Sequence, residues 1–185
     1  FDFDDICVSL KSSSVPITMK AYQLMSRESD YPLHIGVTEA GTVRMGTLKS
    51  AVGIGGQLAL GVGDTMRVSL SADPVEEVYA ARDILKAAGI RKDGAELVSC
   101  PTCGRTRIDL ISLANEVEQR LKTVDKPITV AVMGCVVNGP GEASAADCGI
   151  AGGVGEGLLF KKGQIIKKVP QDQLVDELFR LIETL

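Results

Sequence analysis

Short apolar runs alternate with helix-like stretches through the first half of the chain, and this alternation restricts the possible folds more than any other feature. Strand-like runs are expected at residues 5–10, 33–38 and 66–70. Apolar side chains have helical spacing at residues 15–26, within 43–60 and at 73–88. Repeated strand–helix units predict parallel strands joined by right-handed crossovers. The expected fold class is therefore α/β, and three such units would serve as the last three of a TIM-type (β/α)8 barrel.

The third of these helices has the clearest boundaries. Asp73 is a favourable N-cap, Pro74 stands at the first helical position and Glu76 has capping-box spacing. Gly89 is a natural stop, because glycine readily adopts the left-handed conformation in which many helices end. The helix is expected to run to about Ala88.

The second half of the chain predicts a separate, small α/β module. Its expected elements are strands at 95–98 and 128–132, an amphipathic helix at 108–122, a hairpin at 157–169 and a closing helix at 171–185. The hairpin turn is expected at Lys162-Gly163. The join between the two parts is expected at 89–94, which divides the chain into a domain at 1–90 and a domain at 91–185.

Polar side chains follow each expected strand of the first half. Lys11 and Ser13 follow the first, Thr38 and Glu39 the second, and Ser69 ends the third. In barrels of strand–helix units, ligands bind at the carboxyl ends of the strands. The alternative is that these residues only cap helices or satisfy loop backbone. The residues alone leave both interpretations open.

Composition argues against several classes of protein. Charged residues make up 24% of the 185, and the formal net charge of −4 lacks the basic excess of a nucleic-acid binder. No apolar run approaches the roughly 20 residues of a membrane-spanning helix, and no basic segment opens a signal peptide. Five cysteines, two of them in a CxxC motif, suit metal or redox chemistry in a reducing cytoplasm better than a secreted disulfide framework.

The strongest local signal is the motif SCPTCGR at 99–105, in which Cys100 and Cys103 stand three positions apart. Two thiolates at this spacing can face one metal, because the loop between them folds back. By itself the motif fits a zinc site, an iron–sulfur site or a redox dithiol.

A third cysteine, Cys135, opens the glycine-rich stretch CVVNGPGE at 135–142. The fourth ligand of such a site is either Cys148 or the carboxylate of Glu142. Structural zinc sites usually pair their ligands as two close doublets, which Cys135 and Cys148 do not form. A carboxylate would instead leave an exchangeable corner on an iron–sulfur cluster.

Three other residues have less specific interpretations. Cys7 and Cys148 are expected to be buried as small hydrophobic side chains, because free cysteine is among the most buried residue types. His34, the only histidine, lies within an expected strand. A core or rim position with a satisfied ring is at least as good an expectation for it as an acid–base role.

Four motifs together resemble one enzyme family. SCPTCGR at 99–105, GCVVNGPGEA at 134–143, GVTEAG at 36–41 and GDTMRVSLSADPVEE at 63–77 are similar to 4-hydroxy-3-methylbut-2-enyl diphosphate synthase. The likeness extends over essentially the whole chain, in the same order. It implies the reductive opening of 2-C-methyl-D-erythritol 2,4-cyclodiphosphate in isoprenoid biosynthesis, with a 4Fe–4S cluster and electrons from flavodoxin or ferredoxin.

The resemblance also implies an architecture and a set of site residues. Members of this family are homodimers of a TIM barrel followed by a cluster domain, and this chain would begin at the sixth barrel strand. The implied cluster ligands are Cys100, Cys103, Cys135 and Glu142. The implied substrate-binding residues are Lys11, Ser69, Asn138 and Arg67. Glu39 would face the reacting end of the substrate, and Glu142 would be displaced by it.

Two other functions compete with this one. A structural zinc module would use Cys148 as its fourth ligand and would be colourless. A simple iron–sulfur electron carrier would have no use for Lys11, Glu39 and Ser69 at strand ends.

Overall fold

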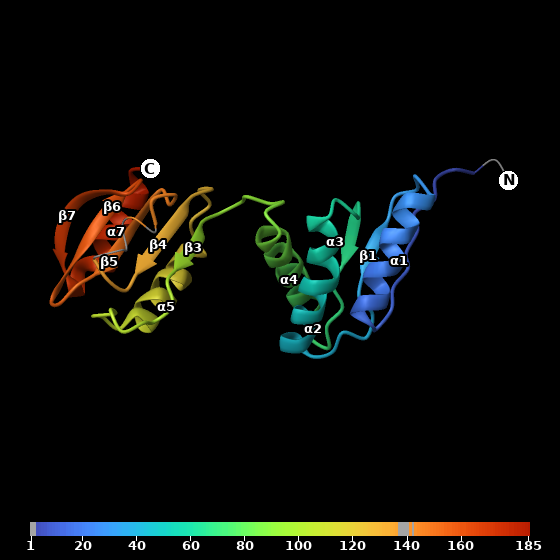
Figure 1. Cartoon of the computed structure of the whole chain (residues 1–185), viewed down its shortest axis with the longest axis horizontal. Coiled ribbons are helices and arrows are strands. Elements are labelled where there is room, and N and C mark those ends of the chain that lie inside the picture. Colours follow the sequence, from blue (N-terminus) through green and yellow to red (C-terminus); the bar gives the residue numbers. More distant parts are fainter. Residues whose placement is uncertain (1–2, 137–140, 142) are drawn as a thin grey trace. The chain divides into compact units, whose positions relative to one another are not determined.

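The computed structural model describes residues 3–136, 141 and 143–185 (Figure 1). The chain divides into two compact units, Phe1–Lys92 and Asp93–Leu185, and each is described by itself. Within the described ranges, no helix combines the length and the apolar character that crossing a membrane requires.

The first unit alternates strands and helices. Its elements are α1 (Val15–Glu28), β1 (His34–Gly36), α2 (Val43–Ser50), α3 (Gly56–Ala59), β2 (Thr65–Arg67) and α4 (Pro74–Ala87). A π-helical turn at Ala51–Gly55 joins α2 to α3. β1 and β2 pair in parallel, with Ile35 opposite Met66, and Val8 forms a single parallel bridge with Leu33. The parallel α/β pattern is as expected, but segment 5–10 contributes only that bridge instead of the expected strand.

The helices of the first unit pack against this short sheet and hold its strands in place. Tyr22 of α1 is fully buried, and its hydroxyl donates to the His34 carbonyl at 2.8 Å and accepts from the Leu10 amide at 3.0 Å. The Asp73 carboxylate caps α4 by accepting the Val75 amide at 3.0 Å, as expected. Gly89 ends the helix at a φ of +70°.

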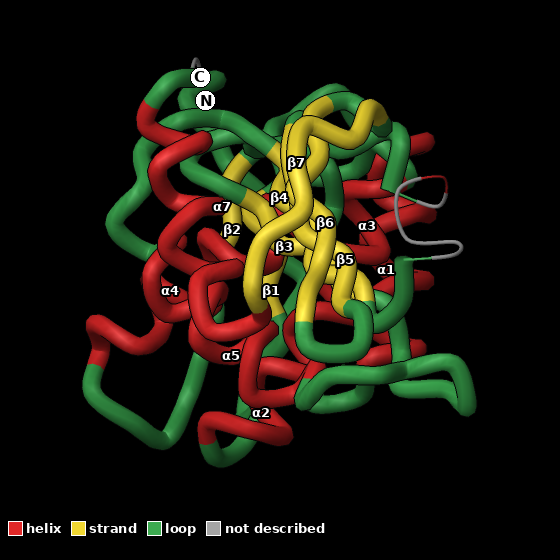
Figure 2. The backbone as a smooth tube through the Cα atoms, turned by 90° about the vertical axis from the view of Figure 1, so that its left-hand side faces the viewer, coloured by secondary structure: helices red, strands yellow, loops and turns green. Residues whose placement is uncertain are grey.

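The described residues of the second unit form a five-stranded sheet with two helices. The strands are β3 (Glu96–Ser99), β4 (Thr129–Met133), β5 (Cys148–Gly152), β6 (Glu156–Lys161) and β7 (Gln164–Pro170). The helices are α5 (Leu110–Leu121) and α7 (Leu174–Glu183), the latter preceded by a 3₁₀ turn at Gln171–Gln173. The strands lie in chain order, and β3, β4 and β5 are parallel whereas β6 and β7 are antiparallel. Figure 2 draws the strands in yellow and the helices in red.

Both faces of the central strands are buried. Val130 and Val132 share a core with α5 and α7, whereas Ala131 and Met133 face a second core built around Phe160. The hairpin turn lies at Lys162-Gly163 as expected, with left-handed φ values of +48° and +74°. β5 was not expected, because its sequence CGIAG has one β-branched residue and two glycines, which are depleted in strands.

Two cysteines outside the motifs have different environments. Cys148 is fully buried, as expected, and burial raises the pKa of its thiol to about 11. The expectation of burial was wrong for Cys7, which is exposed. Cys7 precedes the single bridge at Val8, and this end of the segment has no strand partner that would enclose it.

Candidate functional site

The first unit gathers basic side chains at the carboxyl ends of its two strands. Gly36 and Arg67 are opposite one another as the last residues of β1 and β2. A Cβ at position 36 would lie 3.0 Å from Cε of Lys11 and 2.8 Å from the Arg67 carbonyl oxygen. Glycine at this position therefore allows Lys11 to lie across the strand end.

The basic side chains at these strand ends influence one another's pKa values. Burial, then repulsion from Arg67, lowers the pKa of Lys11. Burial also lowers the pKa of His34, with repulsion from Lys11 and Arg67 as further causes. The Arg67 guanidinium donates from Nε to Ser69 Oγ at 3.2 Å. Lys11, Arg67 and Ser69 thus form one donor-rich group that an anion would stabilise.

Glu39 follows the same strand but is not tied into this group. It is exposed and has a φ of +52°, an uncommon value for a residue other than glycine. No hydrogen bond or ion pair joins its carboxylate to another described residue. Backbone strain of this kind occurs at functional sites and costs on the order of 1–3 kcal/mol.

The single histidine gives a direct test of this group. We expect the pKa of His34 to lie below its ordinary value and to rise in Lys11→Gln, because that substitution removes a repelling positive charge. Proton NMR titration of the imidazole resolves it without overlap. Lys20→Gln on the exposed face of α1 removes the same charge and should leave the titration unchanged. A pKa that does not respond to Lys11→Gln would contradict the grouping.

In the second unit, two of the motif cysteines follow neighbouring strands at one edge of the sheet. Cys100 comes directly after β3, and Cys135 comes two residues after β4. These strands are parallel, with Ser99 opposite Val132, so their carboxyl ends meet at this edge. The Gly134 amide donates to Sγ of Cys100 at 3.2 Å.

The loop that carries the CxxC motif is organised by Thr106. Its hydroxyl accepts the Cys103 amide at 3.1 Å, and its own amide donates to the Cys103 carbonyl at 3.0 Å. Hydrogen bonds from the Arg105 backbone, and then from Thr106, lower the pKa of the exposed Cys103 thiol. Sequence reasoning did not single out Thr106; a hydroxyl residue three positions after the second cysteine was the available signal.

Glycines let this loop pack closely on the sheet edge. A Cβ at Gly152, the last residue of β5, would lie 2.2 Å from Cδ1 of Ile108. A Cβ at Gly134 would lie 3.0 Å from Oγ1 of Thr106. The loop therefore packs directly against the carboxyl end of β5, where a side chain larger than glycine would not fit.

Cys148 lies at the other edge of the sheet. It pairs with Val130, five residues before Cys135, which corresponds to about 16 Å along a parallel strand. A zinc site that uses Cys148 as its fourth ligand does not agree with this position, or with the full burial of the side chain.

The donors fit an iron–sulfur cluster by their chemistry. Cys100, Cys103 and Cys135 are free thiols, and backbone amides point at two of the three sulfurs. Thiolates with hydrogen bonds to sulfur are the usual holders of such clusters. Among the described residues, no three Cys, His, Asp or Glu side chains come together closely enough to hold a metal. Asn138 and Glu142 lie outside the described residues.

Comparison with known families gives two matches that together account for most of the chain. The model described as the GcpE TIM-barrel domain matches residues 1–82. The model described as the GcpE protein C-terminal domain matches residues 96–184.

Curated relatives agree with these models. The 4-hydroxy-3-methylbut-2-en-1-yl diphosphate synthase (flavodoxin) of Clostridium acetobutylicum is 62% identical over 184 residues, 100% of this chain and 53% of the relative. Enzymes with the same name from Clostridium perfringens and Geobacillus thermodenitrificans are 61% and 59% identical, again over 100% of the chain and 53% and 49% of their own lengths. The chain spans about half the length of the curated relatives it matches. On both family models and these identities, the chain belongs to the GcpE protein family.

Proposed function

We propose that this chain supplies the cluster domain and part of the substrate domain of a 4-hydroxy-3-methylbut-2-en-1-yl diphosphate synthase. Residues 1–90 would be the C-terminal part of a (β/α)8 barrel, and residues 91–185 the 4Fe–4S domain. The reaction opens 2-C-methyl-D-erythritol 2,4-cyclodiphosphate, takes up two electrons and two protons, and releases one hydroxyl as water. The observation that carries the proposal is the placement of Cys100 and Cys135 at one sheet edge, beneath the loop that holds Cys103.

In this proposal, the cluster is held by Cys100, Cys103, Cys135 and Glu142. When bound, it supplies electrons to the substrate. The chain's own contribution is to stabilise the thiolates: the Gly134 amide donates to Cys100, and the amides after Cys103 lower the pKa of that thiol. Amide donors to sulfur also favour the reduced, more negative form of such a cluster.

The first unit would bind the diphosphate end of the substrate. Lys11 and Arg67 bring two positive charges to the strand ends, and Ser69 adds a hydroxyl donor. Glu39, exposed beyond the end of β1, would serve as acid or base at the reacting carbon atoms. Asn138 would add a polar contact to the substrate. A plain electron carrier has no need of this polar group, which favours the enzyme.

The proposed function also includes an oligomeric state and an electron donor. The protein would work as a homodimer in the cytoplasm, with flavodoxin or ferredoxin as the electron donor. The names of the curated relatives specify flavodoxin for those enzymes.

Substitution of Arg67 tests the substrate site. In a polypeptide of the relatives' full length that carries this chain, Arg67→Gln should lower kcat/KM for the cyclodiphosphate by roughly 10- to 100-fold. A charge-assisted hydrogen bond contributes about 1.5–3 kcal/mol, which corresponds to that range. Steady-state kinetics with a fixed electron donor measure it.

Arg44→Gln is the matched control, because Arg44 is an exposed arginine of α2 in the same unit. It should leave kcat/KM within about twofold. Equal losses in the two variants, or full activity of Arg67→Gln, would remove Arg67 from the proposed anion site.

A further inference from the structure

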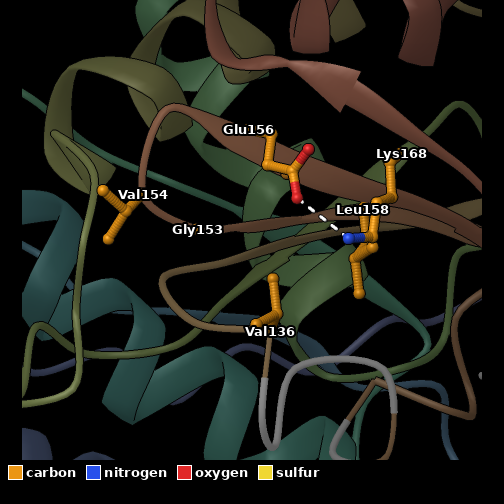
Figure 3. Close-up of a pocket in the computed structure, with 7 residues that line it drawn as sticks. Val136, Gly153, Val154, Glu156, Leu158 and Lys168 are labelled. Carbon is orange, nitrogen blue, oxygen red and sulfur yellow. Dashed lines mark hydrogen bonds and ion pairs between the residues drawn. The ribbon is translucent and has the colours of Figure 1, made fainter.

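A shallow groove lies at the edge of the second sheet that carries the motif cysteines. One hollow of about 280 Å³ is lined by Arg105, Arg107, Cys135, Val136 and the segment 152–154. A second hollow shares Val136, Gly153 and Val154 with the first and continues along β6 and β7. In Figure 3, Val154 lies at the left of this hollow and Val136 at its lower side, and a dashed line joins Glu156 to Lys168. We call the two hollows together the cysteine-edge groove.

The centre of the groove is apolar and exposed. Val154, in the connection between β5 and β6, has 81% of its surface accessible, and Val136 has 38%. Gly153 between them presents backbone only, and a Cβ there would lie 2.7 Å from the Glu156 carbonyl oxygen. An isolated exposed valine is ordinary, but two beside a hollow form the kind of patch that a partner protein buries.

The rim of the groove is basic. Arg105 and Arg107 are exposed, and neither guanidinium has a hydrogen bond or an ion pair to any residue that the structure describes. Lys168 is paired with Glu156 at 2.9 Å, so that pair adds little net charge. Among the described residues, the groove therefore presents two positive charges without an ion-pair partner beside an apolar centre, although the whole chain carries −4.

We infer that the cysteine-edge groove is the docking surface for the electron donor, an acidic one-electron carrier protein of the flavodoxin class. This inference rests on the proposed function. Arginine and apolar side chains together are typical of interface centres, and unpaired rim charges select a partner of opposite charge. Cys135 lines the same groove, so a carrier docked there lies beside a proposed cluster ligand.

A carrier that binds in this groove would transfer one electron in each encounter. A carrier with a reduced flavin would give up one electron there, a cluster held by the proposed ligands would accept it, and no covalent bond would form or break. The arginines act by positioning the carrier and raising its encounter rate, because steering between opposite charges accelerates association and weakens with salt.

The test uses this chain with its cluster reconstituted under anaerobic conditions. The double variant Arg105→Gln/Arg107→Gln should reduce the second-order rate of cluster reduction by reduced flavodoxin at least about tenfold at low salt, and flatten its salt dependence. Reduction by methyl viologen radical, a small cation, should not slow. Val154→Glu, at an exposed apolar position, should also slow cluster reduction by flavodoxin but not by methyl viologen radical.

The matched control is Lys122→Gln/Lys162→Gln, which removes two positive charges at the opposite edge of the same sheet, where Lys162 donates its amide to the Asp147 carbonyl. It should behave as the unchanged chain does. An unchanged rate with flavodoxin in the arginine variant overturns the inference. Equal slowing with flavodoxin and methyl viologen also overturns it, since the arginines would then serve the cluster itself.

Two further measurements separate other causes. Calorimetric titration with inorganic pyrophosphate tests whether the arginines bind a substrate anion. The docking surface is overturned in favour of an anion site if the arginine variant loses pyrophosphate binding and keeps its rate of reduction by flavodoxin. If iron and sulfide analysis finds no cluster, the proposed function fails. Titration with oxidised flavodoxin still tests docking in that case, with binding about tenfold weaker in the arginine variant expected and equal binding overturning it.

Discussion

Cys103→Ser is expected to leave the reconstituted chain with less than about a tenth of the iron and inorganic sulfide that the unchanged chain holds. The Cys103 thiol is exposed and packs in neither core, so its loss does not open a cavity. Its pKa is lowered by backbone amides, which prepares a thiolate for iron. A serine hydroxyl at this position stays protonated, so the proposed cluster would lose one of its three thiolate ligands. Anaerobic iron and sulfide analysis with a visible spectrum measures the loss.

Cys7→Ser is the matched control, because Cys7 is also an exposed cysteine but lies in the other unit. It should leave the iron, the sulfide and the brown colour unchanged. Cys148→Ser should keep the cluster as well, since Cys148 lies at the opposite edge of the sheet. Full cluster content in Cys103→Ser, or stoichiometric zinc that disappears in Cys148→Ser, would rule out the proposed ligand set.

The sequence predicts most of the helices because their signals are local. The Asp73 cap and the Gly89 stop bracket α4 by chemistry that needs no tertiary contact. The hairpin at Lys162-Gly163 is likewise set by two adjacent residues with left-handed backbone. Strand β5 has no such local signal. Its small side chains are required by tertiary contacts, because neighbouring strands and side chains pack closely against them.

Some features of the candidate site could likewise be predicted from the sequence, and others depend on the fold. The family resemblance implies that Cys100 and Cys135 belong to one site, and parallel pairing of β3 with β4 brings their strand ends to one edge. The exposure of Cys7 could not be predicted, because burial depends on whether its segment pairs as a strand. The contribution of Thr106 depends on the fold of one loop, which no periodic pattern encodes.

The polar group of the first unit has two sources in the sequence. Topology places Lys11 and Ser69 after expected strands, whereas Arg67 is implied only by the family resemblance. Lys11 is far from Arg67 and Ser69 in the sequence, and parallel strand ends bring them to one edge. Burial and then repulsion from Arg67 lower the pKa of Lys11, and repulsion from Lys11 and Arg67 adds to the effect of burial on the pKa of His34. A bound diphosphate would offset this repulsion, because a nearby anion favours the protonated forms of both side chains.

Gly149→Ala is expected to destabilise the second unit by at least about 3 kcal/mol, at the upper end of what overpacking costs. A Cβ at this position would lie 2.5 Å from the Ala131 carbonyl oxygen and 2.5 Å from Cζ of Phe160. The first atom is backbone in the neighbouring strand β4, and the second belongs to a fully buried ring. Neither can move without separating β5 from its neighbours.

Urea unfolding followed by circular dichroism measures this effect, and the midpoint of the second unit's transition should fall by roughly 1–3 M. Gly104→Ala is the matched control, since a Cβ there would meet no atom within 4 Å. It should change the free energy of unfolding by no more than about 0.5 kcal/mol. Equal stability of the two variants would mean that β4 and β5 can separate to admit a methyl group. In that case Gly149 would not be what sets the spacing of these strands, whose carboxyl ends precede Cys135 and the cysteine-edge groove.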